Sequence, residues 1–144
     1  MLGRTVLDTD VLVAAVRSDR GASRVLLTAA LEQRYAVLAS VPLMLQYESV
    51  LTRSEHLAAA GISLADVEVL LDAVALIAEP IRISYLWRPM VPDPGDDLVL
   101  ETAVNGRADA VVTFNRRDFE PAAAQFGLEI LAPADAVRRL ENRS

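Results

Sequence analysis

The sequence predicts one α/β domain, a three-layer α/β/α sandwich in which helices cover both faces of a parallel sheet of about four to five strands. Short apolar runs alternate along the chain with longer segments of helical periodicity, which is the order expected of βαβ units. The length of 144 residues is typical of a single domain. No internal repeat, low-complexity segment or linker divides the chain, so we expect residues 1–144 to form one domain.

The first part of the chain reads as strand, helix, helix, strand and helix. Ser40 followed by Pro42 is a helix-start signal, because proline suits the first turn of a helix. The segment after this third helix is read as a break that ends in Gly61. The elements are expected at residues 6–7, 9–17, 24–34, 36–39 and 43–53, followed by the break at 54–62.

The second part begins with the longest expected helix. Ser63 caps this helix and Asp66 occupies the capping-box position. Three prolines and a glycine predict a loop over residues 84–95, which is long enough to serve a function. The remaining elements are expected as a helix at 63–78, a strand at 80–83, a helix at 96–103 ended by Gly106, a strand at 110–114, a turn at 115–119, a strand at 128–131 and a helix at 133–140.

Composition excludes several kinds of chemistry. The chain has no cysteine for a disulfide or a thiolate metal site, and all fourteen basic residues are arginine, so no mechanism can use a lysine. The single histidine, His56, lies in the expected break and is given no catalytic role, which removes serine–histidine schemes. The net charge of −6 argues against a nucleic-acid binder held by phosphate contacts alone. It still permits a nuclease, because divalent ions neutralise acids at a substrate site.

No part of the sequence suggests a membrane or an export signal. The apolar runs are far shorter than the roughly 18 residues of a membrane span. The N-terminus lacks the basic flank, apolar segment and cleavage site of a signal peptide. We therefore expect a cytoplasmic protein.

Acidic side chains follow the first expected strand. Asp8 lies at the carboxyl end of this strand, where ligands collect in open α/β sheets. Its neighbours are apolar, and a buried carboxylate there needs a metal ion or helix N-terminal amides to offset its cost. Asp10 is either a second ligand or an ordinary acid of the first helical turn.

Two later stretches have the same character. Asp93, Asp96 and Asp97 stand where the long loop meets a helix, and N-capping alone explains one or two of them. Asn115 and Asp118 follow the strand before the last, where a turn and a cap are the simpler explanation. The shared placement at strand ends and helix starts favours one joint site of oxygen ligands, which selects Mg²⁺ or Mn²⁺.

A phosphatase is one interpretation of these acids. Asp8 and Asp10 match the Asp-x-Asp start of haloacid dehalogenase-like phosphatases, and residues 95–97 could be their late acidic motif. The order then fails, because the strand ending in Thr113 should lie between the two motifs. The expected lysine is also absent, as it is for a response-regulator receiver, so the phosphatase is the weaker alternative.

Four motifs in order carry a better match. They are residues 6–13 (VLDTDVLV), 45–53 (LQYESVLTR), 93–103 (DPGDDLVLETA) and 108–119 (ADAVVTFNRRDF). Together these motifs resemble a PIN domain, in particular the single-domain toxins of toxin–antitoxin systems, which are VapC-like ribonucleases. The resemblance covers nearly the whole chain.

The resemblance implies a role for each matching residue. Asp8 would be the first metal-binding acid and Asp97 the third, with Asp96 beside it. Asn115 would take the place of the fourth acid, and Thr113 would support that corner.

Other residues would assist these acids. Asp10 and Asp118 are expected to support the site. Arg116, Arg117 and Arg88 flank its predicted mouth and are expected to engage substrate phosphates.

One position departs from the family pattern. The second motif usually has a glutamate directly before its aromatic residue, and here Gln46 precedes Tyr47. Glutamine keeps one acceptor oxygen but loses a negative charge, which weakens a divalent ion held by carboxylates. Glu48 cannot easily substitute, because two residues along a helix correspond to about 200° of rotation.

The sequence therefore leads to one hypothesis with one alternative. The hypothesis is a metal-dependent ribonuclease that hydrolyses phosphodiester bonds endonucleolytically, as the toxin of a toxin–antitoxin pair. The alternative is a weakened or inactive PIN module that binds RNA or a partner protein. The resemblance further implies a cognate antitoxin and a homodimer, for which the apolar face of helix 63–78 is either an interface or part of the core.

Overall fold

The computed structural model describes residues 2–84 and 94–142, and for residues 94–96 it describes the backbone alone. Arg88 and Asp93 of the predicted site, and most of the expected loop at 84–95, lie outside the described residues. Within these ranges, no helix is long and apolar enough to cross a membrane.

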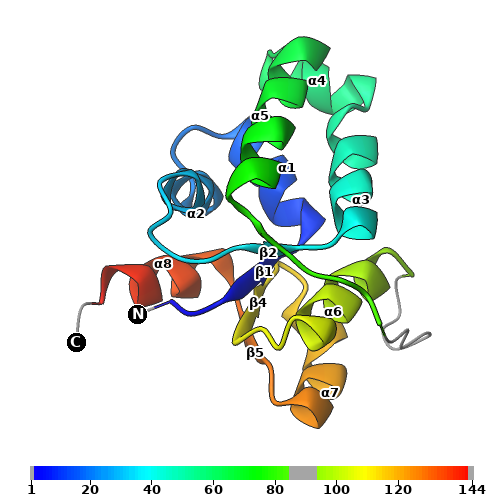
Figure 1. Ribbon diagram of the computed structural model, residues 1–144. Helices are drawn as coiled ribbons and strands as arrows, with labels where there is room; N and C mark the ends of the chain where they lie inside the picture. The colour runs from blue at the N-terminus through cyan, green and yellow to red at the C-terminus, as the bar shows by residue number, and fades with distance from the viewer. Residues whose placement is uncertain (1, 85–93, 143–144) are drawn as a thin grey trace.

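The described chain alternates strands with helices, as the sequence predicts (Figure 1). The strands are β1 (Thr5–Leu7), β2 (Leu38–Ala39), β3 (Glu79–Pro80), β4 (Ala110–Val112) and β5 (Glu129–Leu131). The helices are α1 (Thr9–Arg17), α2 (Ala22–Leu31), α3 (Val41–Leu51), α4 (Ser54–Ala60), α5 (Leu64–Ile77), α6 (Pro94–Asn105), α7 (Arg116–Phe126) and α8 (Pro133–Glu141).

All strand pairs are parallel. β1, β4 and β5 form one sheet in that order, and β2 pairs with β3 in another. An isolated parallel bridge between Thr5 and Val37 joins the two, and the Thr5 amide donates to the Ala36 carbonyl at 2.9 Å. The strands therefore lie in the order β3-β2-β1-β4-β5, which agrees with the predicted parallel sheet of about four to five strands.

Helices cover the strands on both sides. In Figure 1, α6 and α7 lie to the right of the strands, and α2 and α8 lie to the left. α6 contacts β1, β2 and β4, whereas α7 and α8 both contact β5. The remaining helices, α1, α3, α4 and α5, gather above the β2 side of the sheet in this view. The arrangement matches the predicted α/β class.

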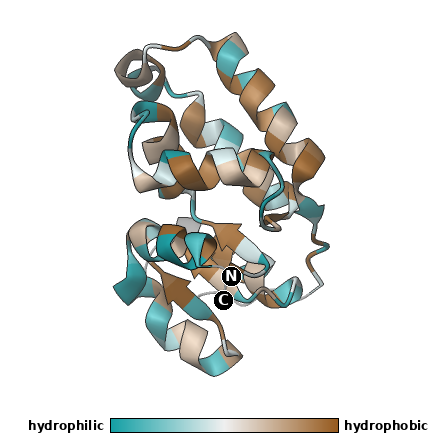
Figure 2. Cartoon of the chain, turned by 90° about the vertical axis from the view of Figure 1, so that its left-hand side faces the viewer, coloured by the Kyte–Doolittle hydropathy of each residue, from teal (hydrophilic) through white to brown (hydrophobic). Residues whose placement is uncertain are grey.

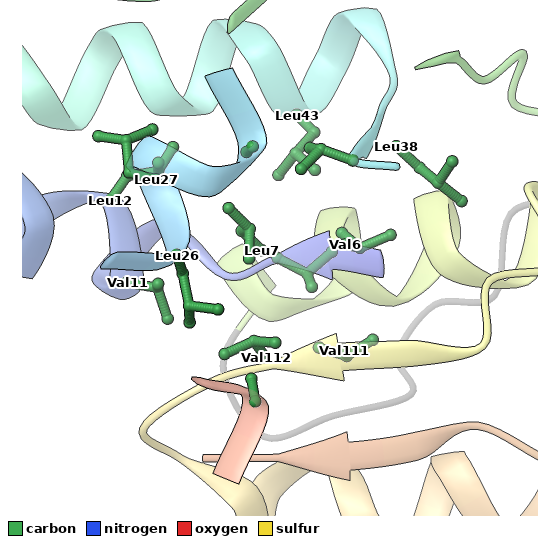
Figure 3. Close-up of a cluster of buried hydrophobic side chains, with 14 of the residues drawn as sticks. Val6, Leu7, Val11, Leu12, Leu26, Leu27, Leu38, Leu43, Val111 and Val112 are labelled. Carbon is green, nitrogen blue, oxygen red and sulfur yellow. The ribbon is translucent and has the colours of Figure 1, made fainter. Parts of the chain in front are cut away.

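The core forms where the strands meet these helices. Tyr47 of α3 and Phe119 of α7 are the largest fully buried side chains. Figure 2 shows the strands as hydrophobic, while the outer helices alternate between hydrophobic and hydrophilic positions. The buried aliphatic cluster in Figure 3 includes Val6, Leu7, Val11, Leu12, Leu26, Leu27, Leu38, Leu43, Val111 and Val112.

The predicted helix starts at Ser40 and Ser63 are confirmed. The Ser40 hydroxyl accepts a hydrogen bond from the Leu43 amide at 3.3 Å, with Pro42 in the first turn of α3. Ser63 and Asp66 form a complete capping box, in which each side chain accepts from the other residue's amide. Both caps satisfy amides that a helix terminus otherwise leaves unpaired.

The break predicted at residues 54–62 is wrong, because residues 54–60 form α4. The predicted break ended in Gly61, but this glycine follows a run of good helix formers, Leu57 and three alanines. Gly61 ends the helix in the left-handed conformation with φ +68°, which glycine adopts without strain.

The prediction for residues 115–119 was incomplete, because this turn continues into α7. Pro121 lies inside this helix, where a proline is usually disfavoured. The helix forms nevertheless, because one of its faces buries Phe119, Ala122 and Ala123 in the core.

The strand predicted at 80–83 is shifted and shorter, because β3 comprises only Glu79–Pro80. Beyond β3, the Ile81 amide donates one further hydrogen bond to the Ala39 carbonyl. β3 is the edge strand in this order, where a proline is tolerated because its missing amide need not enter the ladder.

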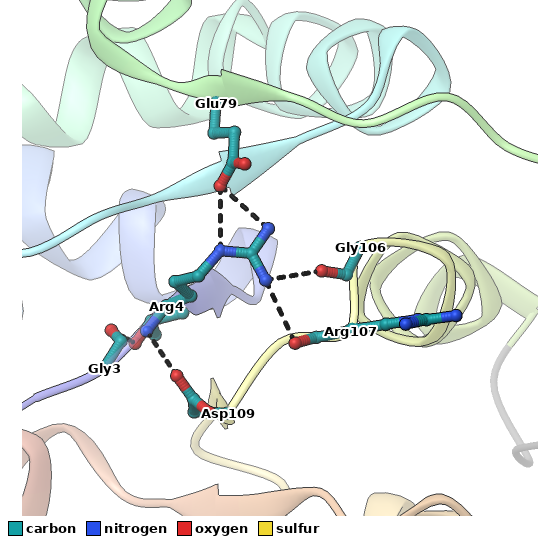
Figure 4. A network of polar contacts seen from close by, with 7 residues as sticks. Gly3, Arg4, Glu79, Gly106, Arg107 and Asp109 are labelled. Atoms are coloured by element: carbon teal, nitrogen blue, oxygen red, sulfur yellow. Dashed lines mark hydrogen bonds and ion pairs between the residues drawn. The ribbon is translucent and has the colours of Figure 1, made fainter.

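Arg4 ties the start of β1 to two other parts of the chain (Figure 4). Its guanidinium contacts the Glu79 carboxylate, with a shortest distance of 2.8 Å. Its Nη1 also donates to the carbonyl oxygens of Gly106 at 2.7 Å and Arg107 at 3.1 Å, just beyond the C-terminus of α6. The C-terminal end of α6 is thereby fixed beside the beginning of β1.

Candidate active site

Asp8 is held rigidly at the carboxyl end of β1. Its side chain is only 3% exposed. Oδ1 accepts the amide of Thr9 at 2.8 Å and so caps α1, and Oδ2 accepts the hydroxyl of Thr113 at 2.6 Å. The Thr9 amide and the Thr113 hydroxyl therefore offset part of the cost of burying this charge. An ionised carboxylate has about four lone-pair sites and can bind a cation while it accepts hydrogen bonds.

The parallel register of β1 and β4 brings Thr113 to Asp8. Leu7 lies opposite Val112, and the Asp8 amide donates to the Val112 carbonyl at 2.9 Å. The residues that follow the two strands, Asp8 and Thr113, are consequently neighbours. This is the expected result for the carboxyl ends of adjacent parallel strands.

Asn115 joins the same corner. Its amide donates to the Thr113 hydroxyl at 2.9 Å, and its side-chain Nδ2 lies 3.4 Å from Oδ2 of Asp10. The structure thus places Asn115 and Asp10 together beside Asp8, where the sequence had expected three residues of one site.

α3 reaches this corner through Tyr47. The Tyr47 hydroxyl donates to the Leu7 carbonyl at 2.5 Å, one residue before Asp8. Burial raises the pKa of the Tyr47 phenol far above its usual range, and the negative charge of Asp8 raises it further. Tyr47 is therefore a neutral hydrogen-bond donor that fixes α3 against the end of β1.

Gln46 is the neighbour of Tyr47 on α3. Its Oε1 is buried and has no hydrogen-bond partner among the described residues. A buried carbonyl oxygen without a partner is costly, so this atom is a candidate ligand for a cation.

α6 supplies two buried acids one helical turn apart. Asp97 is 3% exposed and Glu101 is 2% exposed. A spacing of four residues places both side chains on the same face of the helix. Asp97 also lies in the first turn of α6, where the helix dipole favours a negative charge. The backbone of Asp96 lies in this turn too, but its side chain is outside the described atoms.

We call the contacts of Arg4 with Glu79, Gly106 and Arg107 the Arg4 clamp. The clamp allows the positions of Asp97 and Asp8 along the strand direction to be compared. The nine residues of helix between Gly106 and Asp97 advance about 14 Å. The four residues of strand between Arg4 and Asp8 advance about 13 Å. Arg4 joins the start of β1 to the C-terminal end of α6, and α6 contacts β1. Because the two advances are nearly equal, Asp8 and Asp97 lie at the same end of the sheet.

A hydrogen bond between α3 and α6 completes the frame. The hydroxyls of Ser40 and Thr102 are 2.7 Å apart and buried. Ser40 caps α3, which carries Gln46, and Thr102 follows Glu101 on α6. The two helices that supply candidate ligands are thus tied together.

Glu101 was missed by sequence reasoning. The signal was present, since an acid four residues after Asp97 in an expected helix lies on the same face. The structure shows that Asp97 and Glu101 are both buried, which the sequence pattern alone does not reveal.

The remaining predicted residues lie at the rim. Asp118 is half-buried in the first turn of α7. Arg116 is exposed and lies 3.7 Å from Glu120 and 3.6 Å from Asp135, whereas Arg117 is exposed without an ion-pair partner in the described part of the chain.

The donor set suits a hard divalent cation but is poor in carboxylates. Asp8, Asp97, Glu101 and Gln46 offer only oxygen atoms, the ligand type that Mg²⁺ and Mn²⁺ prefer. Among the described side chains, which leave out those of residues 94–96, no group of three or more Asp, Glu, His or Cys could hold a metal ion. Gln46 and Asn115 place amides where the resemblance expects acids. The residues fit such an ion, and we expect it to be held weakly.

Comparison with known proteins agrees with this fold. A family model described as the PIN domain matches residues 4–117. One similar solved chain belongs to the crystal structure of VapBC2 from Rickettsia felis bound to a DNA fragment from their promoter. It aligns with a TM-score of 0.62 and 15% sequence identity over 90% of this chain and 98% of that chain. At this identity the likeness establishes the fold alone. No curated protein matches the sequence significantly.

Proposed function

Because the chain belongs to the PIN domain family, we propose that it is a divalent-metal-dependent ribonuclease and the toxin of a toxin–antitoxin pair. PIN domains are in general nucleases, and a phosphatase is no longer needed to explain the acids. The observation that carries the proposal is the junction of β1 and β4, where Thr113 fixes the buried carboxylate of Asp8. A rigid, buried acid at the carboxyl end of a central strand is suited to hold a catalytic cation.

In this proposal Asp8 and Asp97 are the principal metal ligands. Glu101 and the amide oxygen of Gln46 complete the oxygen set, and Asp96 lies beside it in the first turn of α6. When bound, Mg²⁺ or Mn²⁺ would lower the pKa of a water and offset the charge that builds on the scissile phosphate.

The other residues orient this set. Thr113 donates to Asp8 and keeps its second oxygen in place, while Asn115 and Asp10 brace the neighbouring turn. Tyr47 holds α3 against β1. Arg117 is exposed at the rim, where its guanidinium can bind a substrate phosphate, and Arg116 and Asp118 lie beside it.

A catalytically weakened PIN module is the second candidate. Gln46 and Asn115 each replace a carboxylate of the family pattern by an amide, and the described residues hold no close group of three acids. With fewer charges at the site, the ion binds less tightly and the fold would then serve to bind RNA or a protein.

The proposal includes protein partners. The VapBC2 neighbour is a complex, which supports a cognate antitoxin for this chain. α5 buries Val67, Leu71 and Val74 but leaves Val69 and Leu76 exposed, at 70% and 86%. Exposed aliphatic side chains also occur on α3, and together they support a homodimer or an antitoxin contact on this side.

Cleavage of single-stranded RNA in the presence of Mn²⁺ tests the function. We expect the wild type to cut the RNA and Asp8→Asn to be inactive. Asparagine still caps a helix well, so this variant should fold. Asp19→Asn, the same change at an exposed position, is the control and should remain active. An Asp8→Asn enzyme as active as the control would refute the assignment, and a wild type that binds but does not cut RNA would favour the weakened module.

A further inference from the structure

Phe114 is an exposed aromatic side chain at the candidate site. It is 54% exposed, more than any other Phe, Tyr or Trp side chain in the described ranges. Tyr35, Tyr47 and Phe119 are each at most 7% exposed. Phe114 is the second residue after β4 and stands between Thr113 and Asn115. Its ring therefore contributes little to the core, although it lies next to the residues that hold Asp8.

The backbone on both sides of Phe114 is fixed. Thr113 is fully buried and hydrogen-bonded to Asp8. Asn115 is hydrogen-bonded to the Thr113 hydroxyl through its main chain and to Asp10 through its side chain. The backbone that carries the exposed ring is therefore held in place, so less conformational freedom is lost when a ligand covers the ring.

The surroundings of Phe114 are polar and partly cationic. Phe114 lines a shallow pocket of about 560 Å³ together with Asn115, Arg116, Arg117, Asp118 and Glu120. Arg117 has no ion-pair partner in the described part of the chain, so it is available for a phosphate. An apolar ring beside a free guanidinium matches a nucleotide, which offers a flat base and a charged phosphate.

A protein partner fits this pocket less well. The cores of protein interfaces are depleted in charged residues, whereas Phe114 is the single apolar side chain in this lining. The exposed aliphatic residues Val41 and Leu45 belong to α3 and line a different groove, between α3 and α5. Phe114 is not part of that apolar surface.

We propose that Phe114 is a base-stacking residue, which holds an unpaired nucleobase of the RNA next to the phosphate at the Asp8 site. The inference rests on the proposed ribonuclease function and adds a residue that positions the substrate. A base can stack on a protein ring only when it is splayed out of a duplex, so the residue selects single-stranded RNA. Stacking does not depend on which base is present, and it adds affinity without sequence specificity.

Binding of a fluorescein-labelled single-stranded 12-nucleotide RNA, measured by anisotropy in Ca²⁺ to suppress cleavage, tests the proposal. Phe114→Ala should weaken binding by about 5- to 150-fold, the range expected for one stacked base. Phe114→Trp should restore it, and Phe114→Leu, which is apolar but not aromatic, should not. Val25→Ala, at a half-exposed aliphatic position of α2, is the control and should bind as the wild type. Because Phe114 is exposed, the thermal midpoint of each variant should match that of the wild type.

A substrate change locates the effect at a base. In a series of RNAs with one abasic nucleotide at each position in turn, one position should weaken binding to the wild type but not to Phe114→Ala. Blunt duplex RNA should bind weakly and equally to both proteins. Equal affinity of the wild type and Phe114→Ala for single-stranded RNA would overturn the proposal, as would a wild type that does not bind this RNA. A changed sedimentation coefficient of Phe114→Ala with unchanged RNA affinity would instead assign the ring to a protein contact.

The outcomes for stacking and for catalysis are separable. Cleavage that does not depend on residue 114 would leave the ribonuclease function standing and overturn the stacking role. Binding that depends on residue 114 without any cleavage would do the reverse.

Discussion

The hydroxyl of Thr113 donates a 2.6 Å hydrogen bond to Oδ2 of Asp8, and both residues are buried. The same hydroxyl oxygen accepts the amide of Asn115 at 2.9 Å. A single threonine at the end of β4 therefore orients the acid at the end of β1 and the turn that follows β4. The proposed site depends on this contact more than on any other that the structure describes.

Thr113→Val removes the hydroxyl while keeping the shape of the side chain. We expect the free energy of unfolding to fall by about 1.5–3 kcal/mol, because a hydrogen bond to a buried charge is lost. RNA cleavage should fall as well, since Asp8 is no longer oriented. Urea denaturation and initial cleavage rates measure the two effects. Thr113→Ser keeps the hydroxyl and should retain cleavage, and equal cleavage by the valine and serine variants would contradict the role assigned to this contact.

Gln46→Glu restores the charge that the family pattern usually has at this position. We expect tighter Mn²⁺ binding, because a carboxylate replaces a buried amide oxygen that has no partner among the described residues. Isothermal titration calorimetry measures the change. Gln125→Glu adds the same charge at an exposed position of α7 and should leave the affinity unchanged. If the two variants gain equally, the effect comes from net charge and Gln46 does not face the ion.

Glu101→Gln tests the acid that sequence reasoning missed. A ligand that binds only the folded state raises the free energy of unfolding by RT ln(1 + [L]/Kd). We expect the rise in thermal midpoint on adding Mn²⁺ to shrink in Glu101→Gln. Glu68→Gln, an exposed position on α5, should show the full rise. An undiminished rise in Glu101→Gln would make this acid a structural residue.

Arg4→Met separates two contributions of the clamp in Figure 4. The variant loses the ion pair to Glu79 and the hydrogen bonds to the Gly106 and Arg107 carbonyls. We expect a loss of about 1–2 kcal/mol in unfolding free energy. Glu79→Gln loses only the ion pair, which is about 40% exposed, and should cost at most about 1 kcal/mol. Urea denaturation measures the unfolding free energy of both variants. Equal losses in the two would mean that the hydrogen bonds to the Gly106 and Arg107 carbonyls contribute nothing.

The positions of the strand-end residues could be predicted because they follow from chain order. Apolar runs mark the strands, parallel pairing follows from the helices between them, and the carboxyl ends of parallel strands meet. Asp8, Thr113 and Asn115 are neighbours for this reason. Their catalytic roles remain proposals that rest on family resemblance and chemistry.

Contacts between helix faces could not be predicted in the same way. The burial of Glu101 depends on how α6 is rotated against β1, which the hydrophobic pattern leaves open. Gly61 and Pro121 are local signals against a helix, and neither shows that α4 or the rest of α7 forms. α7 is stabilised by tertiary packing of Phe119, Ala122 and Ala123. The exposure of Phe114 was equally hidden, since an aromatic residue at the end of an apolar run looks like part of the core.

We propose that Asp8 and Asp97 hold one divalent ion where β1 and α6 meet. Mn²⁺ binding to the purified protein, followed by electron paramagnetic resonance of the free ion, tests it most directly. We predict saturable binding by the wild type and by the Asp19→Asn control, and a loss of at least tenfold in affinity for both Asp8→Asn and Asp97→Asn. Affinities in either variant equal to that of the wild type would contradict the account.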